Sequence, residues 1–252
     1  MFFFEKILDR ISVSNYKHNI ILKGGLLLFS IIGEDMRTTK DMDASLKSIT
    51  LQKENIDEIF HEILSIDLQD NTHFEILDIK DIRAEDEYGG FRINVLGIFE
   101  QLKVNMFIEV STGDIITPKE IEYNYPCIFE EREIPILAYT VETILAEKFE
   151  TIITRSIFNT RLKDFYDIYI LFHENIDKKQ LFRAIKNTFR NRETNIDIDE
   201  FKEVIALLRT DQTILNHWTN YTKRFYYAKN ISFEDILNTL DKIIELVSMS
   251  DF

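Results

Sequence analysis

A glycine pair, an apolar run and a pair of aspartates follow one another within residues 22–45 and constrain the fold more than any other stretch. Gly24 and Gly25 precede the apolar run, and Asp41 and Asp43 follow it after a polar linker. Side chains alternate along a strand, so carboxylates at i and i+2 point to one face and can bind one divalent cation together. A glycine turn that opens a helix offers its backbone N–H groups to an anion. The stretch therefore predicts a phosphate site beside a metal site.

The breakers and the apolar spacing predict a mixed first part and a helical second part. Only three prolines and seven glycines interrupt the chain, which favours long helices joined to a modest sheet. Helical spacing predicts a helix over 51–65, whereas alternation predicts a strand meander over 74–110. From Thr140 the pattern is helical almost to the end, with Thr140 itself as a plausible N-cap. We expect a change from mixed α/β to all-helical structure at this point.

Two motifs in this order resemble one known family. The string RTTKDMD at 37–43, preceded by LKGG at 22–25, resembles the R-x-T-x-D-hydrophobic-D motif of AbiEii-type toxins. These toxins are a branch of the nucleotidyltransferase superfamily, formerly a domain of unknown function. Further along, ILAEK at 144–148 and RLKDFYDIY at 161–169 resemble the ALA-EK and R-x-KD-x-x-D segments of the same branch. The chain departs from many members of the superfamily in having Gly25 where they have serine.

The resemblance implies an α+β fold of the nucleotidyltransferase (DNA polymerase β-like) type. This fold has a mixed sheet with flanking helices, here followed by a C-terminal helical region. We expect a nucleotidyltransferase core over residues 1–138 and a helical domain over 139–252. The resemblance implies that the helical domain contributes Lys148 and Asp164 to the site.

The resemblance also implies the roles of individual residues. The implied catalytic residues are Asp41, Asp43, Lys148 and Asp164. The implied nucleotide-binding residues are Lys23, Gly24, Gly25, Arg37, Thr39, Lys40 and Lys148. The implied metal ligands, for Mg²⁺ or Mn²⁺, are Asp41, Asp43 and Glu109.

The third carboxylate has two candidates. Glu109 alternates with apolar residues and so falls on the polar side of its strand, where it is either a metal ligand or an ordinary exposed glutamate. Asp114, in the turn after that strand, is the alternative. Two magnesium ions would need several hard oxygen ligands, which makes a third carboxylate useful.

The second motif also has a structural and a functional interpretation. Lys148 lies four residues from both Ile144 and Ile152, so it belongs to an inward helix face and needs an anion. That anion is either a carboxylate such as Asp164 or Glu147, or a triphosphate. Buried carboxylates need partners, and for Asp164 and Asp167 these are Arg161 and Lys163. We expect Asp164 to be the active-site aspartate and Asp167 to tie helices together.

Charge limits the ways in which the chain could bind nucleic acid. A formal net charge of −14 argues against indiscriminate coating of nucleic acid. A local basic cluster is either a solvated helix face or an RNA contact, and it consists of Lys178, Lys179, Arg183, Lys186, Arg190 and Arg192. We interpret Trp218 and its aromatic neighbours Tyr221, Phe225 and Tyr226 as helix packing and not as a base-stacking platform.

The motifs together predict a metal-dependent nucleotidyltransferase toxin of a toxin–antitoxin or phage-defence (abortive-infection) system. Its substrate would be a nucleoside triphosphate, its acceptor an RNA, with tRNA as the best candidate, and its genetic partner a cognate antitoxin. One alternative is a nucleotidyltransferase for a small molecule such as a cationic antibiotic, which an acidic surface would suit. Another is a catalytically inactive nucleotide-binding module. With one cysteine, no secretory signal and no apolar run of membrane length, we expect a cytoplasmic protein with no membrane partner.

Overall fold

The computed structural model describes residues 1–33, 39–82 and 89–249, which divide into two units. The first unit comprises residues 1–114 and 120–139, and the second comprises residues 115–119 and 140–252. Arg37, predicted to bind the nucleotide, lies outside the described residues.

A mixed sheet of seven strands forms the centre of the first unit's described residues, in the order β3-β4-β5-β2-β1-β7-β6. The central strand β2 pairs antiparallel with β1 and parallel with β5, and β1 pairs parallel with β7. The strands are β1 (Ile20–Lys23), β2 (Asp41–Leu46), β3 (Thr72–Ile82), β4 (Gly90–Phe99), β5 (Leu102–Ser111), β6 (Ile121–Pro126) and β7 (Glu133–Ala138). The mixed sheet, with helices beside it, confirms the predicted α+β class.

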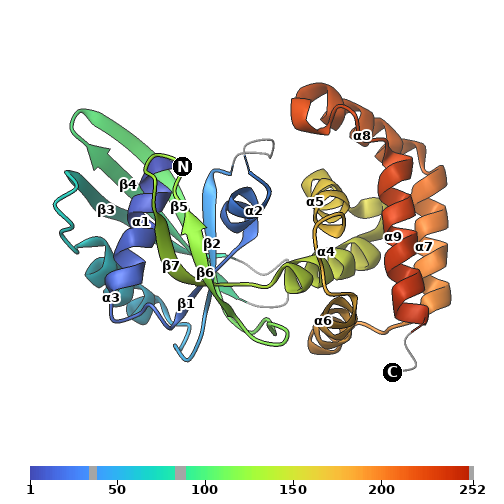
Figure 1. Cartoon of the computed structure of the whole chain (residues 1–252), viewed down its shortest axis with the longest axis horizontal. Coiled ribbons are helices and arrows are strands. Elements are labelled where there is room, and N and C mark those ends of the chain that lie inside the picture. The colour runs from blue at the N-terminus through green and yellow to red at the C-terminus, as the bar shows by residue number, and fades with distance from the viewer. Residues whose placement is uncertain (34–38, 83–88, 250–252) are drawn as a thin grey trace. The chain divides into compact units, whose positions relative to one another are not determined.

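Three helices flank this sheet: α1 (Phe2–Val13), α2 (Gly24–Ile32) and α3 (Lys53–Leu64). Helices α1 and α3 lie on one side of the sheet and α2 on the other (Figure 1). Gly97 allows α1 to approach closely, since a Cβ there would lie 2.7 Å from a ring carbon of Phe3. Met42 lies on the same, α1-covered face and is fully buried. Asp41 and Asp43 alternate with Met42 and therefore point to the opposite face.

The hairpin of β6 and β7 was not expected from the sequence, in which Pro135 indicates a break. The alternation of Ile134, Ile136 and Ala138, all buried, is the signal for β7. Pro135 is tolerated because the pairing of β7 with β1 involves only Leu137 and Ala138.

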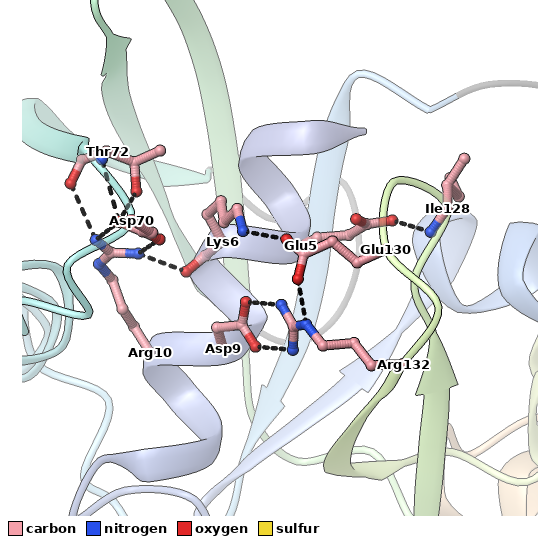
Figure 2. Close-up of polar contacts among 9 residues, drawn as sticks. All are labelled: Glu5, Lys6, Asp9, Arg10, Asp70, Thr72, Ile128, Glu130 and Arg132. Carbon is pink, nitrogen blue, oxygen red and sulfur yellow. Dashed lines mark hydrogen bonds and ion pairs between the residues drawn. The ribbon is translucent and has the colours of Figure 1, made fainter.

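Polar side chains anchor α1 to the loop before β3 and to the β6–β7 hairpin (Figure 2). Arg10 is 1% exposed and donates to both oxygens of Asp70, at 3.1 and 3.0 Å. Arg132, between β6 and β7, donates to both oxygens of Asp9, at 2.7 and 2.5 Å. The two arginines bind α1 through the neighbouring residues Arg10 and Asp9, but only Arg10 lies in the protein interior.

Helices make up the second unit. They are α4 (Val141–Arg155), η1 (Ser156–Phe158), α5 (Leu162–Phe172), α6 (Lys178–Asn191), α7 (Ile198–Thr210), α8 (Gln212–Arg224), η2 (Tyr226–Ala228) and α9 (Phe233–Ser248). The Thr140 hydroxyl accepts from the Thr143 backbone N–H, which confirms the predicted N-cap of α4. Phe149 of α4 meets Phe189 of α6 and Phe201 of α7 with ring centroids 5.8 and 5.6 Å apart. This aromatic cluster orients α6 with one face inward.

Among the helices of the described residues, none is both long and apolar enough to cross a lipid bilayer.

Candidate active site

Strand β2 carries the aspartate pair on the face of the sheet that α1 leaves uncovered. Asp41 and Asp43 are half-buried, on either side of the buried Met42. The Thr39 hydroxyl lies 2.5 Å from Oδ1 of Asp41 and so fixes that carboxylate at the start of the strand. The predicted juxtaposition of the two carboxylates is therefore present in the first unit.

The glycine turn lies directly against one of these carboxylates. Gly24 has a φ of +67°, in the left-handed region, and a Cβ at this position would lie 1.9 Å from Oδ2 of Asp43. The backbone N–H of Gly25 points to the same oxygen at 3.4 Å. Helix α2 begins at Gly24, so its positive N-terminal end lies beside the carboxylate pair. Glycine is required here by backbone conformation and by the space that Asp43 fills.

Glu109 shares this face of the sheet but is bound to an arginine. In the parallel register of β2 and β5, Glu109 lies opposite Asp43. Arg92, on the neighbouring strand β4, donates from Nε to Oε1 of Glu109 at 2.8 Å. Its guanidinium also lies 5.4 Å from the centroid of the Phe107 ring. Arg92 was missed in the sequence because only the β4–β5 register brings it opposite Glu109.

The alternative carboxylate, Asp114, contacts another predicted residue. Lys23 Nζ lies 2.9 Å from Oδ2 of Asp114, and it also lies 5.4 Å from the centroid of the Tyr139 ring. Lys23 pairs with Asp43 in the β1–β2 register and so lies at the edge of the same site. Lys40 precedes β2 and is exposed.

Asp41 and Asp43 fit a divalent cation by their chemistry and position. Among the described residues, no three His, Cys, Asp or Glu side chains are grouped as a ready-made metal cage. Mg²⁺ usually binds through one or two carboxylates together with substrate phosphates and water, and does not need such a cage. The pair beside the α2 N-terminus offers the two carboxylates, and the glycine turn offers the place for phosphate. Arg92 contacts only Oε1 of Glu109, so Glu109 could join them through Oε2.

The second motif forms a buried ion cluster within the helical unit. Lys148 Nζ lies 2.8 Å from Oδ1 of Asp164 and 2.8 Å from Oδ2 of Asp167. Both carboxylates are almost fully buried, at 1% and 0% side-chain exposure. Arg161 Nε lies 2.8 Å from Oδ2 of Asp164 as an ion pair, without the alignment of a hydrogen bond. Of the predicted partners, the structure pairs Lys148 with Asp164 rather than Glu147, and adds Asp167.

Charge pairing decides the protonation of this cluster. Burial alone would lower the pKa of Lys148, but Asp164 and Asp167 together raise it above its ordinary value. Burial likewise opposes ionisation of Asp164, but Lys148 and Arg161 lower the pKa of Asp164. Lys148 and Asp164 are therefore both charged at neutral pH, as a lysinium paired with a carboxylate.

Comparison with known families gives one match that spans most of the chain. The family model described as "Nucleotidyl transferase AbiEii toxin, Type IV TA system" matches residues 6–239. This range includes the glycine turn, the aspartate pair and the Lys148 cluster. A search among curated proteins found no match.

Comparison with solved structures gives two similar crystal structures. The crystal structure of JHP933 from Helicobacter pylori has a TM-score of 0.50 and 12% sequence identity, covering 97% of this chain and 88% of that one. The crystal structure of a "putative nucleotidyltransferase" from H. pylori has a TM-score of 0.49 and 11% identity, covering 97% of this chain and 91% of that one. At such identity, the first likeness concerns the fold alone.

Proposed function

Because the chain belongs to the AbiEii family of nucleotidyl transferase toxins of type IV toxin–antitoxin systems, we propose that it transfers a nucleotide from a nucleoside triphosphate to an RNA. We take tRNA as the first candidate acceptor. The family supplies the reaction class, nucleotidyl transfer, and implies an antitoxin as partner. The metal dependence, the RNA acceptor and a role in phage defence are our proposals. Both the triphosphate and the RNA place such a reaction in the cytoplasm.

One observation carries the proposal: the Asp43 carboxylate lies against the first turn of α2, with the Gly25 N–H at 3.4 Å. Anions bind at helix N-termini because backbone N–H groups and the helix dipole both favour negative charge. A triphosphate held there would have its charged tail beside Asp41 and Asp43. A bound Mg²⁺ or Mn²⁺ would supply charge neutralisation between these carboxylates and the phosphates.

The residues of this chain would then bind and orient the reactants. Gly24 and Gly25 would hold the phosphates through their backbone, and Lys23, Thr39 and Lys40 would line the entrance to them. The acceptor hydroxyl would attack the α-phosphorus, forming a new P–O bond while the bond to pyrophosphate breaks. The proton of the hydroxyl would pass to a carboxylate of the aspartate pair or to water.

Lys148 and Asp164 stay predicted catalytic residues. Two observations support this prediction: the motif match, and the Lys148 side chain, which is 13% exposed and lies between the carboxylates of Asp164 and Asp167. The isosteric variant Asp164→Asn separates the two interpretations. If Asp164 acts in transfer, the folded variant loses transfer more than about tenfold. If Asp164 is only structural, the variant protein that remains folded transfers at the wild-type rate.

The acceptor is tested with α-labelled nucleoside triphosphates, Mg²⁺ and total cellular RNA, in parallel with an antibiotic panel and no RNA. We expect label in a tRNA-sized band with wild-type protein and with the control Asp57→Asn, whose carboxylate is exposed on α3. We expect no label with Asp41→Asn. Label in an antibiotic and not in RNA would overturn the RNA acceptor and retain nucleotidyl transfer.

A further inference from the structure

A straight row of cations runs along the outer face of α6. Lys179, Arg183, Lys186 and Arg190 are all exposed, and we call these four residues the α6 stripe. At 100° per residue they fall within an arc of about 60°, and they extend about 16 Å along the helix. The opposite face of α6 is buried, with Phe189 packed on Phe149 of α4. Figure 1 shows α6 beside α4 within the helical unit.

The α6 stripe is not neutralised by acidic side chains. None of its four side chains forms an ion pair within the part of the chain that the structure describes, although the chain has 44 acidic residues. Two carboxylates from α6 and its neighbour α4 have other partners. Asp177 caps the helix by accepting from the backbone of Lys179 and Gln180, and Glu150 binds Arg192.

Folding alone gives no reason for this arrangement. Neighbouring members of the stripe are three or four residues apart, the spacing at which like charges on a helix repel. The helix dipole gives no net reason either, because it disfavours Lys179 in the first turn and favours Arg190 in the last turn. A solvated helix face would ordinarily alternate the signs of its charges at this spacing. The repulsion between neighbouring cations therefore remains as a cost to the helix, which is expected of a surface kept for an anionic partner.

The chemistry of the stripe favours phosphate over protein. Protein interfaces have an apolar centre with few charges. None of the exposed large apolar side chains in the described part of the chain belongs to α6. Evenly spaced lysine and arginine side chains without apolar neighbours match a chain of phosphates, because affinity for nucleic acid comes largely from such contacts.

We propose that the α6 stripe binds the phosphate backbone of RNA, as the docking surface for the acceptor. That the bound RNA is the acceptor rests on the proposed function. That the stripe binds a chain of phosphates rests on its charges and exposure alone. Binding at the stripe would raise the local concentration of acceptor, and the acidic remainder of the protein would repel RNA that does not engage the stripe.

The test compares two full-length variants that each lose four positive charges. One replaces the stripe by Lys179→Gln, Arg183→Gln, Lys186→Gln and Arg190→Gln. The other is a scattered control with Lys17→Gln, Lys53→Gln, Lys119→Gln and Lys242→Gln, all exposed in the wild type. The net charge of the two variants is equal, so any difference between them reports position and not total charge. Circular dichroism checks that both are folded.

Binding is measured by fluorescence anisotropy with labelled tRNA over a range of salt concentrations, without nucleotide. We expect the stripe variant to bind about tenfold or more weakly than the control. We also expect its plot of log affinity against log salt to be shallower by about 3, since each single-strand phosphate contact contributes about 0.7. Equal binding by the two variants, or no RNA binding by wild-type protein, would overturn the proposal.

Two further measurements distinguish RNA binding by the stripe from binding of an acidic protein and from the transfer reaction itself. Labelled polyglutamate is titrated as a second probe, and loss of polyglutamate binding without loss of tRNA binding would assign the stripe to an acidic protein and overturn the RNA assignment. Transfer of labelled nucleotide is measured independently. If RNA binds through the stripe but never receives label, the proposed acceptor is refuted and the stripe remains an RNA-binding surface. If the stripe variant labels RNA as well as the control does, RNA remains the acceptor and the stripe is refuted as its docking surface.

Discussion

At the scale of single residues, Gly24 meets two requirements that no other amino acid can meet together. Its φ of +67° strains any residue with a Cβ, and the space for that Cβ is filled by the Asp43 carboxylate. The sequence predicted the glycine turn and the aspartate pair separately. Their contact depends on the register of β1 and β2, which the sequence does not specify.

Gly24→Ala tests this contact, with Gly33→Ala as its control. Both variants place a Cβ on a backbone with positive φ, but only the Cβ at position 24 would overlap the Asp43 carboxylate. Gly33 has a φ of +90° and nothing within 4 Å of a built Cβ. We expect both variants to lose about 1–3 kcal/mol of unfolding free energy to backbone strain. Only Gly24→Ala should also displace Asp43 and reduce nucleotide transfer by more than about tenfold. Urea unfolding and transfer assays measure the two effects, and equal activities would contradict the contact.

The Lys148 cluster predicts a pH dependence with a definite sign. The folded-state pKa of Asp164 is lowered from its ordinary value of 3.8. A lowered pKa gives stability that is fully present above the unfolded-state value and is lost as the pH falls through the folded-state value. Wild type should therefore exceed Asp164→Asn in stability by a constant amount above about pH 5, and the gap should narrow below about pH 4. Denaturant unfolding from pH 2 to 7 measures the gap, and a gap independent of pH would show that charge is not its cause.

At the scale of elements, apolar periodicity located most helices and strands but not all of them. Helix α3, the β3–β5 meander and helices α6 to α9 follow from spacing alone, because each buries one regular face. Strands β6 and β7 were missed because Pro135 is a breaker in most interior strands. Here the parallel neighbour β1 pairs with β7 only at Leu137 and Ala138, after the proline. Local sequence does not reveal this long-range pairing.

The anchoring of α1 gives a matched pair of variants at this scale. Arg10 and Arg132 each bind a carboxylate with two hydrogen bonds, but the Arg10 side chain is 1% exposed and that of Arg132 is 36% exposed. Arg10→Met should cost about 3–5 kcal/mol of unfolding free energy, because Asp70 keeps its charge in a partly buried site. Arg132→Met should cost about 1 kcal/mol or less, since solvent screens its pairs. Thermal unfolding of both variants measures this, and similar losses would mean that burial does not control the strength of these pairs.

At the scale of the whole molecule, the family assignment and the charge distribution point to one activity. The family match over residues 6–239 includes both motifs that the sequence singled out. The net charge argued against indiscriminate coating of nucleic acid and left a local contact open, and the helix geometry of α6 shows that four of its cations form one exposed row. The cluster of six cations is visible in the sequence, but the alignment of four of them along one helix face follows from the fold.

We propose that Asp41 and Asp43, beside the α2 turn, serve nucleotidyl transfer with release of pyrophosphate. Parallel reactions with α-labelled and γ-labelled nucleoside triphosphate, using wild-type protein and the double variant Asp41→Asn with Asp43→Asn, test this role. We predict that α-label joins the acceptor, that γ-label leaves as pyrophosphate, and that a folded double variant does neither. Label on the acceptor from the γ position, or an active double variant, would contradict the account.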